Sequence, residues 1–204
     1  MNASSKVENL MLILSSPSGA GKTTLSKKIQ QKYKNFKISV SHTTRKARPN
    51  EINGVDYFFV NEGEFKKMIN DNEFYEHAKI FDNYYGTSKY SIKQLLKGKS
   101  DILFDIDWQG TQQLSNYSEL NLIKIFVLPP NKNELKNRLI NRNQDDKLTV
   151  EKRMKGYDKD KNHWNEYDYV ILNDNLELCF RQIENIINYH KNKIELKNFI
   201  KIHT

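Results

Sequence analysis

The residues with the plainest chemistry lie in a glycine-containing loop near the amino terminus. Residues 15–24 read SerSerProSerGlyAlaGlyLysThrThr and separate an apolar segment from a helical pattern. Gly19 and Gly21 allow backbone N–H groups to curl around a phosphate, and Lys22 supplies a positive charge to the β and γ phosphates. The hydroxyl of Thr23 is a suitable ligand for Mg²⁺. The segment therefore predicts a phosphate-binding loop.

This loop departs from the usual P-loop pattern at one position. The pattern GxxxxGK[ST] requires glycine where the chain has Ser16, although the two glycines and the lysine that carry the chemistry remain. The order of strand, loop and helix argues against a mere glycine-rich turn that caps a helix. We expect nucleotide phosphates to bind at Ser16, Pro17, Ser18, Gly19, Ala20, Gly21, Lys22, Thr23 and Thr24.

A phosphate-binding loop indicates a nucleotide but not a reaction, because GTPases, ATPases and kinases all use one. A GTPase would also read guanine through an AsnLysxAsp segment, whereas residues 131–134 read AsnLysAsnGlu. We interpret this segment as a capping box, in which Asn131 caps a helix and Glu134 reaches back to the cap.

A second group of residues predicts a separate anion site. Arg45 and Arg48 are three positions apart, have hydroxyl residues beside them and are followed by Tyr57. Such side chains can hold a phosphomonoester through bidentate and single hydrogen bonds. Arginines in a loop are usually exposed to solvent, so this pattern alone does not establish an anion site.

Two acidic residues end an apolar segment farther along the chain. Asp105 and Asp107 are two positions apart, so in a strand they point to the same side of the sheet. Enzymes with a phosphate-binding loop place a carboxylate there as a partner of Mg²⁺, and we assign Asp105 mainly to the metal. The competing interpretation is a structural pair of acids that caps the next helix.

The elements that must position these residues alternate between strands and helices. The expected strands are 10–15, 37–40, 55–60, one or two within 74–85, 101–107, 122–128 and 169–172. The expected helices are 22–34, 62–70, 88–97, one from 131, and 176–189 with Leu178, Ile183, Ile186 and Ile187 facing inward. This alternation is typical of an α/β protein with a parallel, doubly wound sheet, which binds ligands beyond the carboxyl ends of its strands.

Composition limits the class of protein further. The 204 residues suit one domain, and 37% hydrophobic with 28% charged residues is typical of a soluble globular chain. The lone Cys179 lies in an apolar stretch and predicts a structural thiol in a reducing compartment. Because the amino terminus is polar and no apolar run is long enough to span a membrane, we expect a cytoplasmic protein.

The net charge of +8 implies attraction to polyanions, which include nucleotides, nucleic acids and anionic membranes. The arginines cluster in the nucleotide motifs, and no signature of a nucleic-acid-binding fold occurs. We therefore expect small-molecule partners, and neither a nucleic acid nor a membrane. A protein that binds DNA in a salt-sensitive manner is the alternative that the charge leaves open.

The sequence resembles the guanylate kinase family over about residues 12–175. Six motifs carry the resemblance in family order: SerProSerGlyAlaGlyLysThrThr at 16–24, SerHisThrThrArg at 41–45 with Arg48 and Glu51, AsnGlyValAspTyr at 53–57, TyrGluHisAla at 75–78, AsnTyrTyrGlyThr at 83–87 and AspIleAspTrpGlnGly at 105–110. The resemblance implies a P-loop kinase three-layer fold, with a parallel core sheet flanked by helices. Its implied divisions are a core of 1–40, 88–137 and 154–204, a GMP-binding region of 41–87 and a lid of 138–153.

The resemblance also implies the reaction, in which ATP and GMP (or dGMP) give ADP and GDP with Mg²⁺ and no covalent enzyme intermediate. Guanine presents its N1–H and 2-amino groups as donors along one edge, and Glu76 stands in the base-reading position where a carboxylate would accept both. Arg45, Arg48, Tyr57 and Tyr85 would hold the GMP phosphate. The whole implied GMP site is Ser41, Arg45, Arg48, Glu51, Tyr57, Glu76, Tyr85, Thr87 and Asp107.

A third element implied by the resemblance is a mobile lid bordered by arginines. Arg138, Arg142 and Arg153 would close over the ATP phosphates and exclude water, because phosphoryl transfer depends on in-line positioning and on cations around the transferred group. Asn173 would lie beside the adenine. The residues implied in catalysis are Lys22, Arg45, Asp105, Arg138, Arg142 and Arg153, and those implied in metal binding are Thr23 and Asp105.

The chain departs from the family pattern mainly in the lid. Asn143 replaces a frequent glycine, and residues 146–148 read AspLysLeu where Ser or Thr followed by Glu is usual. His42 stands where a hydroxyl residue is common, and we expect no catalytic role for it. An inactive interaction domain of similar fold is another alternative, but such domains typically lack the phosphate-loop lysine that is present here as Lys22. We expect a monomer or a homodimer.

Overall fold

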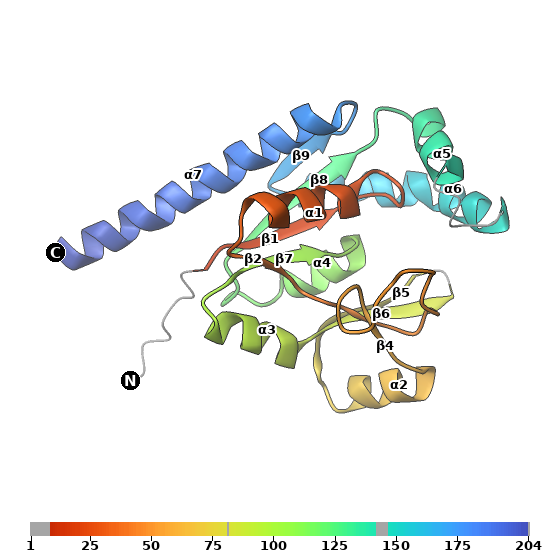
Figure 1. Cartoon of the computed structure of the whole chain (residues 1–204), viewed down its shortest axis with the longest axis horizontal. Helices are drawn as coiled ribbons and strands as arrows, with labels where there is room; N and C mark the ends of the chain where they lie inside the picture. Colours follow the sequence, from red (N-terminus) through yellow and green to blue (C-terminus); the bar gives the residue numbers. More distant parts are fainter. Residues whose placement is uncertain (1–8, 81, 142–146, 204) are drawn as a thin grey trace.

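The computed structural model describes residues 9–80, 82–141 and 147–203, and its centre is a parallel β-sheet (Figure 1). Every neighbouring pair of strands in this sheet is parallel. The strands lie in the order β2 (Phe36–Ile38), β7 (Asp101–Asp105), β1 (Met11–Ser15), β8 (Leu122–Leu128) and β9 (Tyr169–Leu172). Parallel strands need crossover connections, which the intervening helices supply. The predicted α/β class with a parallel sheet is confirmed.

The side chains of the central strand β1 alternate between two apolar layers. Leu12 and Leu14 belong to the layer on one face of the sheet, whereas Met11 and Ile13 belong to the layer on the other. All four are fully buried, which explains why the strand is a continuous apolar run. The covering helices are α1 (Lys22–Lys32) and α7 (Leu176–His203) on the first face, and α3 (Lys89–Lys97) and α4 (Trp108–Leu114) on the second.

A second sheet is formed by the chain between β2 and α3. Its strands lie in the order β4 (Phe58–Phe59), β3 (His42–Thr43), β6 (Asn83–Ser88) and β5 (Phe74–Ile80), and α2 (Glu62–Asn70) packs against it. The core of this unit is aromatic, because Phe65 of α2 stacks on Phe74 and Tyr84 with ring centroids 4.6 and 5.4 Å away. Gln113 of α4 joins the unit to the central body by bonding both the N–H and the C=O of His77, at 3.1 and 2.8 Å.

His42 is part of this aromatic core. Its ring stacks on Phe58 at a centroid distance of 4.7 Å and meets the edge of Phe74 at 5.7 Å. Burial lowers the pKa of the imidazole, so the neutral form is favoured. These contacts give His42 a packing role.

Helices α5 (Lys132–Asn141) and α6 (Lys147–Lys161) follow β8 and lie at one end of the molecule in Figure 1, and the 3₁₀ turn η1 (Asn162–Glu166) follows α6. A third apolar cluster joins α5 and α6 to the loop between β1 and α1. Ala20 of that loop is fully buried beside Leu135 and Leu139 of α5 and Val150 of α6. The helices of the predicted lid therefore pack directly on the predicted phosphate-binding loop.

Some helices and strands begin or end at other residues than the sequence predicts. The strand predicted at 101–107 ends at Asp105, because Asp107 is the N-cap of α4 and its Oδ1 accepts the N–H of Gly110 at 3.0 Å. The strand predicted at 55–60 is only Phe58–Phe59 long, and the helix predicted at 22–34 ends at Lys32. Strands β8 and β9 and helix α2 have the predicted bounds.

One side-chain prediction for the helices is confirmed and another is wrong. Asn131 caps α5 as predicted, since its Oδ1 accepts the N–H of Glu134 at 2.8 Å, and the Glu134 carboxylate accepts from Nε of Arg138 at 2.9 Å. Leu178, predicted to face inward, is 53% exposed, and the neighbouring Cys179 and Phe180 pack in its place. Helix α7 also continues to His203. Within the described ranges, none of the helices combines the length and apolar character that crossing a bilayer requires.

Candidate active site

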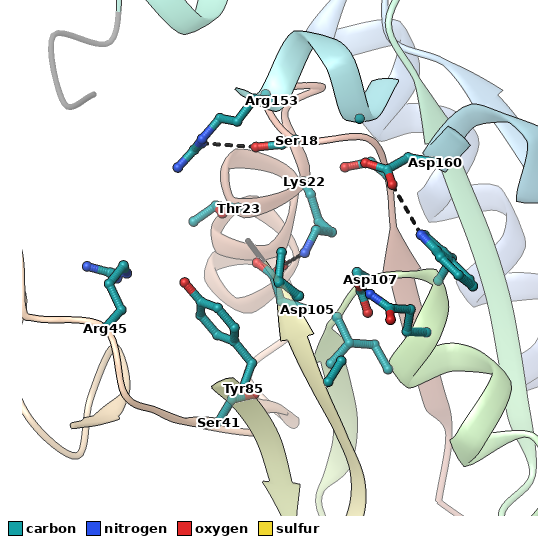
Figure 2. A pocket seen from close by; sticks show the side chains of 18 of the residues that line it. Ser18, Lys22, Thr23, Ser41, Arg45, Tyr85, Asp105, Asp107, Arg153 and Asp160 are labelled. Carbon is teal, nitrogen blue, oxygen red and sulfur yellow. Dashed lines mark hydrogen bonds and ion pairs between the residues drawn. The ribbon is translucent and has the colours of Figure 1, made fainter. Parts of the chain in front are cut away.

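A cavity of about 730 Å³ opens beyond the carboxyl ends of β1 and β7. Segments far apart in the chain line it: Ser16, Ser18, Gly19, Gly21, Lys22, Thr23 and Thr24 from the loop after β1; Ser41, Arg45, Arg48, Tyr57, Glu76 and Tyr85 from the second sheet and its loops; Asp105 and Asp107 after β7; and Arg138 and Arg153 from α5 and α6. In Figure 2, Tyr85 points into the space between Arg45 and the pair formed by Lys22 and Asp105. The two predicted anion sites therefore open into the same cavity.

The loop after β1 has the backbone of a phosphate cradle. Gly19 and Gly21 have φ values of +94° and +104°, in the left-handed region that favours glycine. Gly21 is the N-cap residue of α1, and no side chain among the described residues caps this helix. The N–H groups of the first helical turn, with the positive end of the helix dipole, can thus serve an anion in the cavity.

Lys22 and Asp105 form an ion pair on the floor of the cavity (Figure 2). The pairing of β1 with β7 sets this contact, because Leu14 of β1 lies beside Asp105 in the register. The hydroxyl of Ser26 on α1 donates to the other carboxylate oxygen of Asp105 at 3.4 Å. Thr23 lines the same part of the cavity, so the two predicted metal ligands lie near the predicted phosphate lysine.

Across the cavity, an acidic residue holds both arginines of the second anion site. Oε1 of Glu51 accepts from Nη2 of Arg45 at 2.9 Å, and its Oε2 accepts from the backbone N–H of Arg48 at 2.8 Å. Glu51 does not line the cavity, so it fixes the positions of the two arginines from outside the lining. The Arg45 guanidinium lies 5.3 Å from the ring centre of Tyr57, and burial raises the pKa of that phenol. Tyr57 therefore stays a hydrogen-bond donor at neutral pH.

Glu76 is a buried acid at the inner end of the cavity. It is 4% exposed and lies opposite Thr87 in the ladder of β5 and β6. Burial raises the pKa of Glu76 to about 7, and the negative charge of Asp107 adds to this effect. Thr87 is fully buried, and hydrogen bonding from its side chain and backbone acts in the opposite direction, lowering the pKa of the Glu76 carboxyl. A Cβ at Gly110 would lie 2.6 Å from Glu76 Oε2, so the carboxylate fits only against glycine.

Two of the three predicted lid arginines have defined partners. Arg138 donates from Nε to Glu134 at 2.9 Å and from Nη2 to the backbone oxygen of Asn173 at 3.1 Å. Arg153 of α6 donates from Nη1 to Oγ of Ser18 at 2.9 Å (Figure 2). Arg142 lies outside the described residues, and so does Asn143.

Five residues of the predicted site do not line the cavity. Ala20 is buried against α5, and Asn173 is 3% exposed behind the loop, where its Nδ2 donates to the Ala20 carbonyl at 2.7 Å. The place of Asn173 beside an adenine stays a prediction. The full set outside the lining is Pro17, Ala20, Glu51, Thr87 and Asn173.

The cavity also has lining residues that the sequence analysis did not single out. The clearest group links α4 to the end of α6: the indole Nε1 of Trp108 donates to Asp160 at 3.1 Å, and the ring of His163 stacks on the indole at 3.7 Å. Asp160 lies in an AspLysAspLys run that reads as a solvated helix face, so no local signal could have found it. The unpredicted lining residues are Ala78, Lys79, Ile80, Ile106, Trp108, Gln109, Asn141, Gly156, Lys159 and Asp160.

Comparison with known proteins connects this cavity to a family. The family model described as "Guanylate kinase" matches residues 8–190. The guanylate kinase of Novosphingobium aromaticivorans is 47% identical over 178 residues, which cover 87% of this chain and 80% of the relative, and that of Rickettsia bellii is 45% identical over 92% of this chain and 98% of the relative. The crystal structure of guanylate kinase from Anaplasma phagocytophilum matches with a TM-score of 0.74 and 33% identity, covering 90% of this chain and 86% of the other. The chain therefore belongs to the guanylate kinase family.

Proposed function

We propose that this chain transfers the γ-phosphoryl group of ATP to GMP or dGMP across the described cavity, and releases ADP and GDP. Membership of the guanylate kinase family makes the chain a nucleotide-binding kinase of purine metabolism. The observation that carries the residue assignments is that Lys22 and Arg45, from separate anion sites, line one cavity. A shared cavity suits direct transfer, because the donor and acceptor phosphates must meet in line.

On the ATP side, the loop of residues 16–24 would hold the phosphates. Its backbone N–H groups and the amino end of α1 supply fixed partial positive charges. Lys22 would exchange Asp105 for the β and γ phosphates, and Arg138 and Arg153 would add positive charge from α5 and α6. Arg142 is assigned to the same task by the family pattern alone.

Thr23 and Asp105 would hold Mg²⁺. When bound, the ion would neutralise charge on the phosphate oxygens and orient them. The donor set fits, because a hydroxyl and a carboxylate that line the cavity beside Lys22 offer the hard oxygen ligands that Mg²⁺ prefers.

On the other side, the GMP phosphate would lie against Arg45, Arg48, Tyr57 and Tyr85. Two guanidinium groups offer paired donors to the phosphate oxygens, and the phenols add neutral donors. Glu51 would act indirectly, since it holds the side chain of one arginine and the backbone of the other.

The guanine base would be read by Glu76. Its carboxylate can accept from N1–H and from the 2-amino group at once, which no other common base offers in the same arrangement. Ser41 and Thr87 would supply hydroxyls, since Ser41 lines the cavity and Thr87 lies opposite Glu76 in the ladder of β5 and β6. Asp107 caps α4 through Oδ1 and would present its remaining acceptor capacity to the base.

Transfer itself would need no covalent intermediate and no dedicated general base, because cations and in-line geometry carry most of the catalysis. We propose the same division of the chain as the sequence analysis: a core of 1–40, 88–137 and 154–204, a GMP-binding region of 41–87 and a lid of 138–153. An ion pair between Lys152 of α6 and Asp82 beside β6, with N and O 2.8 Å apart, bridges the lid and the GMP-binding region. Monomer or homodimer, and a cytoplasmic location, stay predictions.

The test is a coupled assay of the purified chain with ATP and either GMP, dGMP, AMP, UMP or CMP. We expect turnover with GMP and dGMP and at least a hundredfold lower kcat/KM with the others. Preference for another acceptor would overturn the substrate assignment. Complete lack of turnover with intact folding would favour the inactive interaction domain, and salt-sensitive binding of duplex DNA without turnover would favour the nucleic-acid alternative.

A further inference from the structure

Asn173 lies behind the phosphate-binding loop and joins it to the central sheet. It follows β9 directly, and its backbone N–H donates to the carbonyl of Leu128 at 2.7 Å, which adds one bond to the ladder of β8 and β9. Its side-chain Nδ2 donates to the Ala20 carbonyl at 2.7 Å in a buried hydrogen bond. A loop carbonyl is thereby held by a residue whose own backbone is part of the sheet.

This hydrogen bond determines the direction of a backbone donor in the cavity. The carbonyl of Ala20 and the N–H of Gly21 belong to one peptide group, and in a trans peptide these two bonds point in opposite directions. Because Asn173 holds the carbonyl on the side away from the cavity, the Gly21 N–H points to the cavity side, where Gly21 is part of the lining.

Glycine at position 21 would otherwise allow this peptide group to rotate. Gly21 has φ of +104°, and glycine adopts positive and negative φ about equally readily. A Cβ at Gly21 would also overlap the amide nitrogen of Asn173. The close approach of the asparagine therefore requires glycine here, and the asparagine in turn supplies the restraint that glycine lacks.

The same residue contacts an arginine of the cavity. The backbone oxygen of Asn173 accepts from Nη2 of Arg138 at 3.1 Å, while Glu134 holds Nε of the same guanidinium. Only the side-chain contact with the loop depends on the identity of residue 173. Substitutions there can thus change the loop and leave the acceptor of Arg138 in place.

We propose that Asn173 is a positioning residue for the phosphate-binding loop. Its side-chain amide keeps the Gly21 N–H directed at the nucleotide phosphates, and it raises phosphate affinity without touching the nucleotide. This role deepens the proposed function, since it rests on the binding of ATP phosphates at the loop.

The test compares Asn173→Ala and Asn173→Asp with the unmodified chain, using Mg-ADP and Mg-pyrophosphate as probes in calorimetric titrations. The alanine variant removes the donor, and the aspartate variant keeps the shape but places an acceptor against the Ala20 carbonyl. Asn175→Ala is the matched control, because Asn175 caps α7 by accepting the N–H groups of Glu177 and Leu178, at 3.0 and 3.1 Å.

We expect both Asn173 variants to lose about 10- to 100-fold in affinity for both probes, because the Gly21 N–H would lose its aligned hydrogen bond to a charged phosphate group. GMP affinity should change less than twofold, and the control should bind all probes normally with a lower melting temperature. Loss of ADP affinity with unchanged pyrophosphate affinity would show an adenine contact and overturn the proposal. Lower melting temperatures with unchanged affinity for both probes would reduce Asn173 to a structural role and also overturn it.

These binding measurements are independent of catalysis. A chain that binds both probes with the expected pattern but does not phosphorylate GMP would overturn the proposed function and support this inference. If the aspartate variant does not fold, the alanine variant alone decides the outcome.

Discussion

The ammonium group of Lys22 and the carboxylate of Asp105 are paired with each other in the cavity. One is the proposed ligand of the ATP phosphates and the other the proposed ligand of Mg²⁺. Their side chains are about equally shielded, with 20% and 19% exposed. Binding of Mg-ATP would exchange one ion pair for two favourable contacts, lysine with phosphate and carboxylate with metal. The pair thus keeps both groups where the nucleotide is expected.

Replacing Lys22 by alanine should abolish phosphorylation of GMP and leave the fold intact, because the positive charge next to the transferred phosphate is lost. A coupled assay and thermal unfolding by circular dichroism measure the two effects. Lys28→Ala is the matched control, since Lys28 lies on the same helix and pairs with Glu177 2.6 Å away, outside the cavity lining. A Lys22 variant with more than about a tenth of normal kcat/KM would contradict the role of this residue.

Replacing Asp105 by asparagine should raise the Mg²⁺ concentration needed for half-maximal activity by at least tenfold. The amide keeps the size of the side chain but removes the negative charge that favours the ion. A titration of activity against Mg²⁺ at saturating ATP and GMP checks this expectation. An unchanged Mg²⁺ requirement would remove Asp105 from the metal site.

Glu51→Ala should weaken GMP binding by about 1.5–3 kcal/mol, the range for hydrogen bonds to charged groups, because Arg45 and the backbone of Arg48 lose their common acceptor. The KM for ATP should stay within twofold, since Glu51 is remote from the loop after β1. Steady-state kinetics with each substrate varied in turn separate the two effects. Equal losses for ATP and GMP would point to general damage of the fold.

Glu76 should make GMP binding depend on pH. Burial raises its pKa to about 7 from the ordinary 4.5, and the base-reading role needs the ionised form. GMP affinity should therefore increase as the pH rises through 7. The stability of the protein without GMP should change in the opposite direction. The free energy of unfolding that the protonated Glu76 contributes is fully present below about pH 4.5 and is lost as the pH rises through 7.

Glu76→Gln is the control for this pH effect, because the GMP phosphate itself titrates near pH 6. The variant should bind GMP about 1.5–3 kcal/mol less tightly and lose much of its preference for GMP over IMP. It should also show a flatter dependence of melting temperature on pH between 5 and 8. An unaltered preference for GMP over IMP would exclude Glu76 from reading the base.

Cys179 should be inert in the folded protein. It is 1% exposed, and burial raises the pKa of its thiol to about 11, so little thiolate forms at pH 8. Because the chain has a single cysteine, reaction with a thiol reagent such as dithionitrobenzoate should appear only on unfolding. Rapid labelling of the native chain without loss of structure would be incompatible with the packing of α7.

Much of the fold could be predicted from local patterns. The strands β8 and β9 and the helix α2 had the predicted bounds, because the apolar patterns that predict them lie within a few consecutive residues. Leu178 was misplaced since periodicity shows that a helix has an apolar face but does not fix which neighbouring residue enters the core. In the structure, Cys179 and Phe180 do so.

The sequence by itself determined the chemistry of the candidate site, because the phosphate-binding loop and the paired arginines are continuous segments whose residue types state what they can bind. Only the tertiary structure decided which distant residues hold the phosphate-binding loop and the cavity lining in position. Ala20 and Asn173 are 153 positions apart, and Trp108 and Asp160 are 52 apart. Contacts of that kind arise when strands and helices pack, so the roles of Asn173 behind the loop and of Asp160 beside the indole leave no mark in the local sequence.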